Sequence, residues 1–202
     1  MASQISDKFQ FEGVEHAIAG ISSEPLFEPS MLGLAPTAMC SLCWRGYQGI
    51  FSLSDSNLVL KTLHINLLDK DQDFASQTGP AINNVSPAGP DSDWDIFNNH
   101  YAGMDYRLDY TGGLLLADEF IDELSFHIGF DPAWKYKRVL ELVFVNGVLR
   151  KEFDRSAQIA NVRNTILETH DDNDVYRMSS ATESLEFIGK LFDQTYQIDD
   201  GT

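Results

Sequence analysis

The feature that most constrains the fold of this chain is an Asn-Gly dipeptide, Asn146-Gly147, between two apolar runs. Both central residues of a type I′ turn need a positive φ, which Asn and Gly adopt readily, so the dipeptide predicts a tight β-hairpin. A two-residue turn fixes the pairing and places Leu140 opposite Phe153. The strand before the turn, residues 139–145, carries apolar side chains in both alternation phases, which predicts a central strand covered on both faces.

A second hairpin is predicted between Cys40 and Leu67, with Asp55-Ser56-Asn57 as its turn. The apolar residues of the return strand change phase between Leu60 and Leu63, which indicates a β-bulge near Lys61-Thr62. Residues 106–130 return to strand character. There the pattern favours strand, turn and strand, with a short helical stretch near 117–124 and a further strand over 124–128.

The apolar period changes to that of a helix after Asp154, with Ser156 as a possible N-cap. The predicted stripe of this helix is Ile159, Val162, Ile166 and Leu167. A capping box at Ser180–Glu183 opens a second amphipathic stretch that extends to Tyr196. The predicted fold class is α+β, in which an antiparallel sheet of at least two hairpins is covered by two C-terminal amphipathic helices.

The length of 202 residues suits a single domain, here predicted over 1–202. Within it we expect an irregular N-terminal arm over 1–40, with at most a short helix near 13–19. The sheet should occupy 41–153 and include a long acidic loop at 69–105, punctuated by proline and glycine. The helical part should occupy 154–202.

The net charge of this chain is strongly negative: 31 Asp and Glu stand against 14 Lys and Arg, a formal charge of −17. Such a field repels phosphate backbones and anionic lipids, so we expect neither nucleic acid nor membrane as a partner. It favours a basic protein partner, or it serves solubility alone. The N-terminus lacks the basic and apolar regions of a secretory signal, and two cysteines make no disulfide framework, so a cytoplasmic location is expected.

Three short motifs resemble metal or redox sites but lack features that such sites require. Cys40 and Cys43 form a C-x-x-C pair that lacks the helix N-terminus of a redox site and the further ligands of a zinc site, so a structural role is expected. The acidic runs starting at Asp69 and Asp91 copy the opening of a calcium loop, but they lack its glycine at position six and its glutamate at position twelve. No cofactor and no metal are predicted.

The second acidic run combines charge with an aromatic anchor and gives the predicted partner-binding residues. These are Asp91, Asp93, Trp94 and Asp95. An exposed tryptophan surrounded by acids joins a contact residue to charges that steer a basic partner. Trp94, Phe97 and Tyr101 are also candidates to pin the far end of the loop against the sheet.

Two histidines lie close in sequence to a carboxylate, as a general base and its orienting acid would. His127 precedes Asp131, and His100 precedes Asp105. Neither lies beside a nucleophile motif, so a hydrogen-bonded structural histidine is the favoured interpretation. A hydrolase that uses one of these pairs is kept as an alternative. Arg45, next to Trp44, is expected either near an aromatic face or paired with an acid.

Two segments carry a resemblance to small bacterial proteins of uncharacterised activity. The segments are Cys43-Trp-Arg-Gly-Tyr47 with Phe51-Ser-Leu, and Tyr110-Thr-Gly-Gly-Leu-Leu with Phe126-His-Ile-Gly-Phe130. This W-R-G-Y hairpin followed by T-G-x-L and H-x-G-[FY] resembles proteins of the kind carried as immunity proteins beside polymorphic toxins. The resemblance implies a cytoplasmic, non-enzymatic protein that binds a cognate basic toxin domain and covers its active site. An acidic adaptor without a toxin partner is a further alternative.

Overall fold

The computed structural model of this chain describes residues 3–23, 25–68, 78–124, 129–169 and 194–196. Its strands are β1 (Lys8–Phe11), β2 (Val14–Ile21), β3 (Tyr47–Ser54), β4 (Asn57–Ile65), β5 (Asn99–Arg107), β6 (Gly112–Phe120), β7 (Tyr136–Val145) and β8 (Val148–Asp154). The α-helix of the described residues is α1 (Ser156–Thr169), and short 3-10 turns are η1 (Pro29–Leu32), η3 (Asp122–Leu124) and η4 (Ala133–Lys135). None of these helices is long and apolar enough to cross a membrane.

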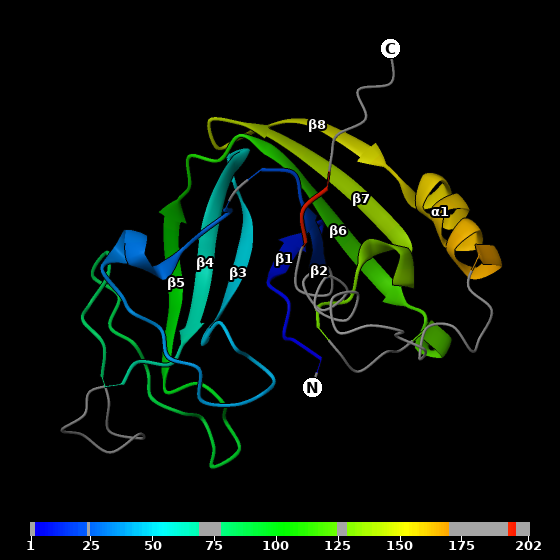
Figure 1. The fold of residues 1–202 in the computed structure, drawn as a ribbon. Helices are drawn as coiled ribbons and strands as arrows, with labels where there is room; N and C mark the ends of the chain where they lie inside the picture. Colours follow the sequence, from blue (N-terminus) through cyan, green and yellow to red (C-terminus); the bar gives the residue numbers. More distant parts are fainter. Residues whose placement is uncertain (1–2, 24, 69–77, 125–128, 170–193, 197–202) are drawn as a thin grey trace.

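The strand pairings close on themselves in a ring (Figure 1). Neighbours follow the order β3-β1-β2-β6-β7-β8-β4, and β3 also pairs with β4, while β5 adds to the edge of β4. The pairing between β4 and β8 is short: in the described strands, Asn57 opposite Val148 is the one residue pair that joins them. All pairings are antiparallel except β1 with β3, which is parallel. The sheet is therefore mixed, and the expectation of a purely antiparallel sheet is wrong.

The hairpin at Asn146-Gly147 is confirmed, with φ values of 49° and 71° at its two turn residues. The strand before the turn is central, as expected, because β7 pairs with both β6 and β8. The predicted register fails in its far half. The ladder shifts by one residue next to Phe144, so Phe153 lies opposite Glu141 and not opposite Leu140. A bulge of this kind changes register without any turn signal in the sequence.

The bulge predicted at Lys61 is confirmed, because Leu60 pairs with Phe51 while Thr62 pairs with Ile50. The extra residue keeps Leu58, Leu60, Leu63 and Ile65 on one face, and all four are fully buried in the main core. That core takes side chains from every strand from β1 to β7, so it lies inside the ring. Burying each such leucine or isoleucine contributes about 1.5–3 kcal/mol to folding.

The N-terminal 40 residues are more regular than predicted. An irregular arm, with a short helix near 13–19, was expected, but β1 and β2 form a hairpin whose turn is Glu12-Gly13, with φ values of 50° and 79°. The sequence does not show this hairpin because β2 is buried on both faces. Ile18 packs in the main core, and Ala17 and Ala19 on the other face are also buried, so apolar and polar residues do not alternate. Residues 25–46 are irregular apart from η1 and an isolated bridge between Cys40 and Cys43.

Two boundaries in the middle of the chain also differ from expectation. Strand β5 begins at Asn99, so the connection that follows β4 spans 66–98 and not 69–105. Residues 117–120 continue β6 where a helix was expected, and one helical turn, η3, follows at 122–124. The strand expected over 124–128 lies almost wholly outside the described residues.

The helical part is confirmed only as far as α1. This helix packs outside the ring, where Ile159 joins a second small core with Leu115 and Val139. Arg163 donates from Nε to the Trp134 carbonyl at 2.7 Å and from Nη2 to the Tyr136 carbonyl. Only part of the predicted apolar stripe is buried, because Val162 and Leu167 are exposed.

Ser156 is the first residue of α1 rather than its cap, and its Oγ accepts the backbone N–H of Val139 at 3.1 Å. Most of the second predicted helix, 180–196, lies outside the described residues. Its last three residues are described. Thr195 makes a parallel bridge to Ile21, so this end is extended and the helix expected there is wrong.

Gly13 and Gly147 both have a positive φ, but only Gly147 is also crowded by neighbouring atoms. Comparing the two positions therefore distinguishes backbone strain from crowding. Gly147 (φ +71°) has no room for a Cβ, which would collide with the Leu108 carbonyl, whereas Gly13 (φ +79°) has open space around it. We expect Gly13→Ala to cost about 1–2 kcal/mol of unfolding free energy, the ordinary penalty of a left-handed residue. Gly147→Ala and Gly147→Val should cost more than that, measured by urea denaturation. Equal losses at the two positions would mean that the Gly147 turn is not packed against Leu108.

Candidate functional site

A network of three buried asparagines holds the connection between β4 and β5 in place. Asn66 donates its Nδ2 to the Ile96 carbonyl at 2.7 Å, and its Oδ1 accepts the backbone N–H of Asn98 at 3.0 Å. Asn98 in turn bonds both backbone groups of Leu67. Asn99 accepts the N–H of Gly79 at 2.7 Å. Because buried amide groups must be paired, this network fixes both ends of the connection on the sheet.

The acidic turn, residues 91–95, is fixed by its own hydrogen bonds. The Asp95 carboxylate accepts the backbone N–H groups of Asp91 and Phe97, each at 3.0 Å. The N–H of Asp95 donates to the Ser92 carbonyl at 3.1 Å. Asp95 therefore faces inward, with a side chain only 14% exposed, and shapes the turn as an Asx-type residue.

The other predicted partner-binding residues point outward. Asp91 and Asp93 are exposed, and Trp94 is 91% exposed. The expectation that Trp94 pins the loop against the sheet is therefore wrong. Phe97 and Tyr101, which are 5% and 0% exposed, do pin it. The structure thus brings the four candidates into one turn and divides them into an inward carboxylate and three outward side chains.

Behind this turn lies a chain of three titratable side chains. The His100 Nε2 lies 2.8 Å from Oδ2 of Asp95, and the Nδ1 atoms of His100 and His64 are 2.6 Å apart. The His64 ring stacks on Phe97, with ring centroids 5.8 Å apart and an interplanar angle of 24°. Strands β4 and β5 position the pair, because His64 lies directly opposite His100 in their ladder.

Burial lowers the pKa of His64, and the neighbouring His100 lowers it further, against the opposing charges of Asp95 and Asp91. At Asp95 burial alone would raise the pKa, but the N–H groups of Phe97 and Asp91 and the nearby His100 bring it below its usual value. One proton between the two Nδ1 atoms lets one ring donate and the other accept, which requires one of the two Nδ1 atoms to be unprotonated. A neutral His64 meets this requirement. The two histidines are joined by a hydrogen bond, and His100 lies at ion-pair distance from the fixed Asp95 carboxylate; we call these three side chains the relay.

The relay gives His100 a different acid from the one predicted. Asp105, the expected partner, instead pairs with Lys61 at 2.9 Å between Nζ and Oδ1. The described residues bring no serine, threonine or cysteine into hydrogen bonding with either ring, so the relay has no nucleophile among them. His127, the other candidate, lies outside the described residues. Sequence reasoning missed His64 because only the bulge at Lys61 and the pairing of β4 with β5 bring it to His100.

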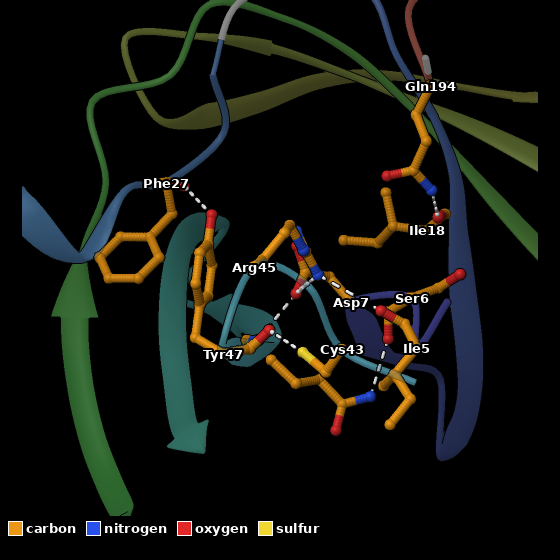
Figure 2. Close-up of polar contacts among 11 residues, drawn as sticks. Ile5, Ser6, Asp7, Ile18, Phe27, Cys43, Arg45, Tyr47 and Gln194 are labelled. Atoms are coloured by element: carbon orange, nitrogen blue, oxygen red, sulfur yellow. Dashed lines mark hydrogen bonds and ion pairs between the residues drawn. The ribbon is translucent and has the colours of Figure 1, made fainter. Parts of the chain in front are cut away.

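Arg45 of the W-R-G-Y segment has a structural role that combines both expectations (Figure 2). Its guanidinium binds the Asp7 carboxylate through two bonds of 2.9 and 3.0 Å and lies 4.7 Å from the centre of the Tyr47 ring. The Cys43 thiol donates to the Tyr47 carbonyl at 3.2 Å, and burial raises its pKa. Cys43 is therefore part of the packing beneath this segment. No cluster of metal-binding side chains occurs in the part of the chain that the structure describes.

Comparison with models of known protein families, with curated proteins and with solved structures finds no match to this chain.

The histidine relay predicts how folding stability depends on pH. The pKa of His64 in the folded chain lies below its value in the unfolded chain, which is about 6.5. The stability that neutral His64 contributes to the free energy of unfolding is therefore fully present above about pH 6.5 and is lost as the pH falls below that value. The loss is at most about 1.4 kcal/mol per pH unit for one proton. We expect wild type to lose more unfolding free energy than His64→Gln between pH 7.5 and 5.5, measured with urea.

The other lowered histidine, His16, is present in both proteins and cancels in this comparison. Equal losses in wild type and His64→Gln would contradict a neutral, partly buried His64.

Proposed function

We propose that this chain is a protein-binding module that captures a basic protein partner through the acidic turn. The observation that carries the proposal is the 91% exposure of Trp94 on a turn that is fixed by hydrogen bonds. Tryptophan is the residue most enriched among binding hot spots, and a preorganised turn loses little conformational entropy on binding. A fully exposed indole on a rigid turn therefore supports a contact that another protein completes.

The distribution of charge around the turn supports a basic partner. The described residues of 66–98 include no lysine or arginine, while Asp91 and Asp93 are exposed. Between Phe9 and Tyr106 the described cations are Arg45 and Lys61, and each is paired with a carboxylate. The acidic turn and the described residues of its connection therefore present a negative field that speeds encounter with a positively charged surface.

The specific partner that we propose is a basic toxin domain whose active site the turn covers. This step rests on the resemblance of the W-R-G-Y and T-G-x-L segments to immunity proteins, together with the acidic surface. In that role the chain acts in the cytoplasm as an inhibitor without its own catalysis. A toxin that acts on anionic substrates has a positively charged active site. An exposed tryptophan flanked by acidic residues is complementary to such a site.

A second candidate function, a small hydrolase, is favoured by the Asp95–His100–His64 relay, because a histidine in contact with a carboxylate or a second histidine can act as a general base toward water. This candidate expects turnover of activated esters or phosphoesters by the purified chain, abolished in His64→Gln and His100→Gln. Absence of turnover in wild type would remove it and leave the binding function alone.

Co-expression tests the binding function most simply. We expect the chain to copurify with the product of the neighbouring gene and to restore growth of cells that express that product. Neither copurification nor rescue would contradict the proposal of a cognate toxin.

Substitutions in the turn test the site itself. Trp94→Ala combined with Asp93→Ala should weaken partner binding at least tenfold in calorimetry, because it removes both anchor and steering charge. The far-ultraviolet circular dichroism should stay unchanged, since both side chains are exposed. Asp171→Asn with Asp172→Asn is the control: it removes two negative charges, one more than the turn variant, and should still leave the affinity nearly unchanged. Equal effects of the two double variants would place the binding surface elsewhere.

A further inference from the structure

A second recognition feature lies on β2, away from the acidic turn. Strand β1 pairs with residues 14–17 of β2, and the Asp7 carbonyl just before β1 accepts the N–H of Ile18 at 2.9 Å, so the β1 side leaves this edge of β2 unpaired from Ala19 onward. The C-terminal segment, Gln194–Tyr196, fills this edge beside β2 (Figure 1). Ile21 donates its N–H to the Gln194 carbonyl at 2.8 Å and accepts the N–H of Tyr196 at 3.1 Å. The Gln194 side chain donates to the Ile18 carbonyl at 2.8 Å (Figure 2).

The side chain of Tyr196 enters a socket with a glycine floor. A Cβ at Gly20 would lie 3.1 Å from the Tyr196 ring, and a Cβ at Gly113 would collide with the Tyr196 hydroxyl. The two glycines come from neighbouring strands, β2 and β6, and their lack of side chains makes the space for the ring. We call this space, formed by Gly20, Gly113 and Glu141, the tyrosine socket.

The end of the tyrosine socket is built for a phenol hydroxyl. Glu141, only 1% exposed, accepts the Tyr196 hydroxyl at 2.9 Å on one oxygen. Its other oxygen is held by Arg155, whose Nε lies 2.6 Å away and whose Nη2 also contacts it. Burial, and then donation to Glu141, raise the pKa of the Tyr196 hydroxyl, so it remains a donor at ordinary pH.

This chemistry selects tyrosine over its close relatives. Phenylalanine would fill the same space but leave a buried carboxylate oxygen without its donor, which is costly. A phosphotyrosine would bring negative charge against Glu141, and the glycine floor leaves no space for a phosphate. The backbone bonds to Ile21 add recognition of an extended strand, as in other cases of strand addition to a sheet edge.

We propose that the edge of β2 and the tyrosine socket form a peptide-recognition site for an extended segment with glutamine two residues before tyrosine. The chain's own C-terminal segment is its resident ligand, and a partner segment of the same pattern takes its place. The site is independent of the acidic turn, because none of its residues lies in 66–98. A tethered segment has an effective concentration near the millimolar range, so an outside segment binds well only when the resident one is weakened.

The test uses the full chain and a fluorescein-labelled peptide of residues 192–198, followed by fluorescence anisotropy. Tyr196→Ala empties the tyrosine socket, and we expect it to bind the peptide at least tenfold more tightly than wild type does. Peptides with phenylalanine in place of the tyrosine should bind at least fivefold more weakly, and phosphotyrosine peptides should not bind. Equal affinities of wild type and Tyr196→Ala, or of the tyrosine and phenylalanine peptides, would overturn the proposal.

Two further variants complete the test. Tyr196→Ala combined with Gly113→Ala fills the floor and should abolish peptide binding, and retained binding would overturn the tyrosine socket. If Tyr196→Ala does not fold, Tyr196→Phe keeps the ring and should still bind the tyrosine peptide at least threefold better than wild type. Equal affinity there would again overturn the proposal. If wild type is a dimer and Tyr196→Phe is a monomer, the occupant of the site is a second copy of this chain and not a segment of another protein. That result would also overturn the proposal.

Discussion

The interaction on which the rest of the structure depends is the Asp7 carboxylate at the start of β1. One of its oxygens accepts the backbone N–H of Gly49 at 2.8 Å, and both are held by the Arg45 guanidinium. These bonds set the register of the parallel pair of β1 and β3, which closes the ring. Because the Asp7 side chain is 8% exposed, loss of Arg45 alone would leave a buried charge without its partner, a defect that costs about 3–5 kcal/mol in comparable pairs.

Closure of the ring determines where the chain can present recognition surfaces. A closed ring satisfies its backbone groups internally and fills its interior with leucine and phenylalanine, so contacts with other molecules must come from connections and from open edges. The acidic turn is such a connection, held rigid by buried asparagines and by Asp95. The edge of β2 beyond β1 is such an open edge, and the residues around Tyr196 cover it. The two surfaces use different chemistry, which separates steering of a basic partner from selection of a tyrosine.

The parts of this architecture that were predictable are those specified by local sequence. Asn146-Gly147 requires its turn, and the phase change around Lys61 requires a bulge wherever β4 pairs. The N-terminal hairpin was not predictable, because β1 has only four residues and β2 is buried on both faces. His64 and the closure by Asp7 depend on contacts between residues more than 30 positions apart, which no local pattern specifies. Glu141 did carry a signal, since a single charge within an apolar strand must find a partner inside the protein.

The proposed role of the acidic turn as the surface that meets another protein can be tested by hydrogen–deuterium exchange of the complex with the neighbouring gene's product. Binding should slow exchange at the backbone amides of 91–97, with little change along β7 and β8. Protection confined to the other strands or to α1, with the acidic turn unchanged, would contradict this role.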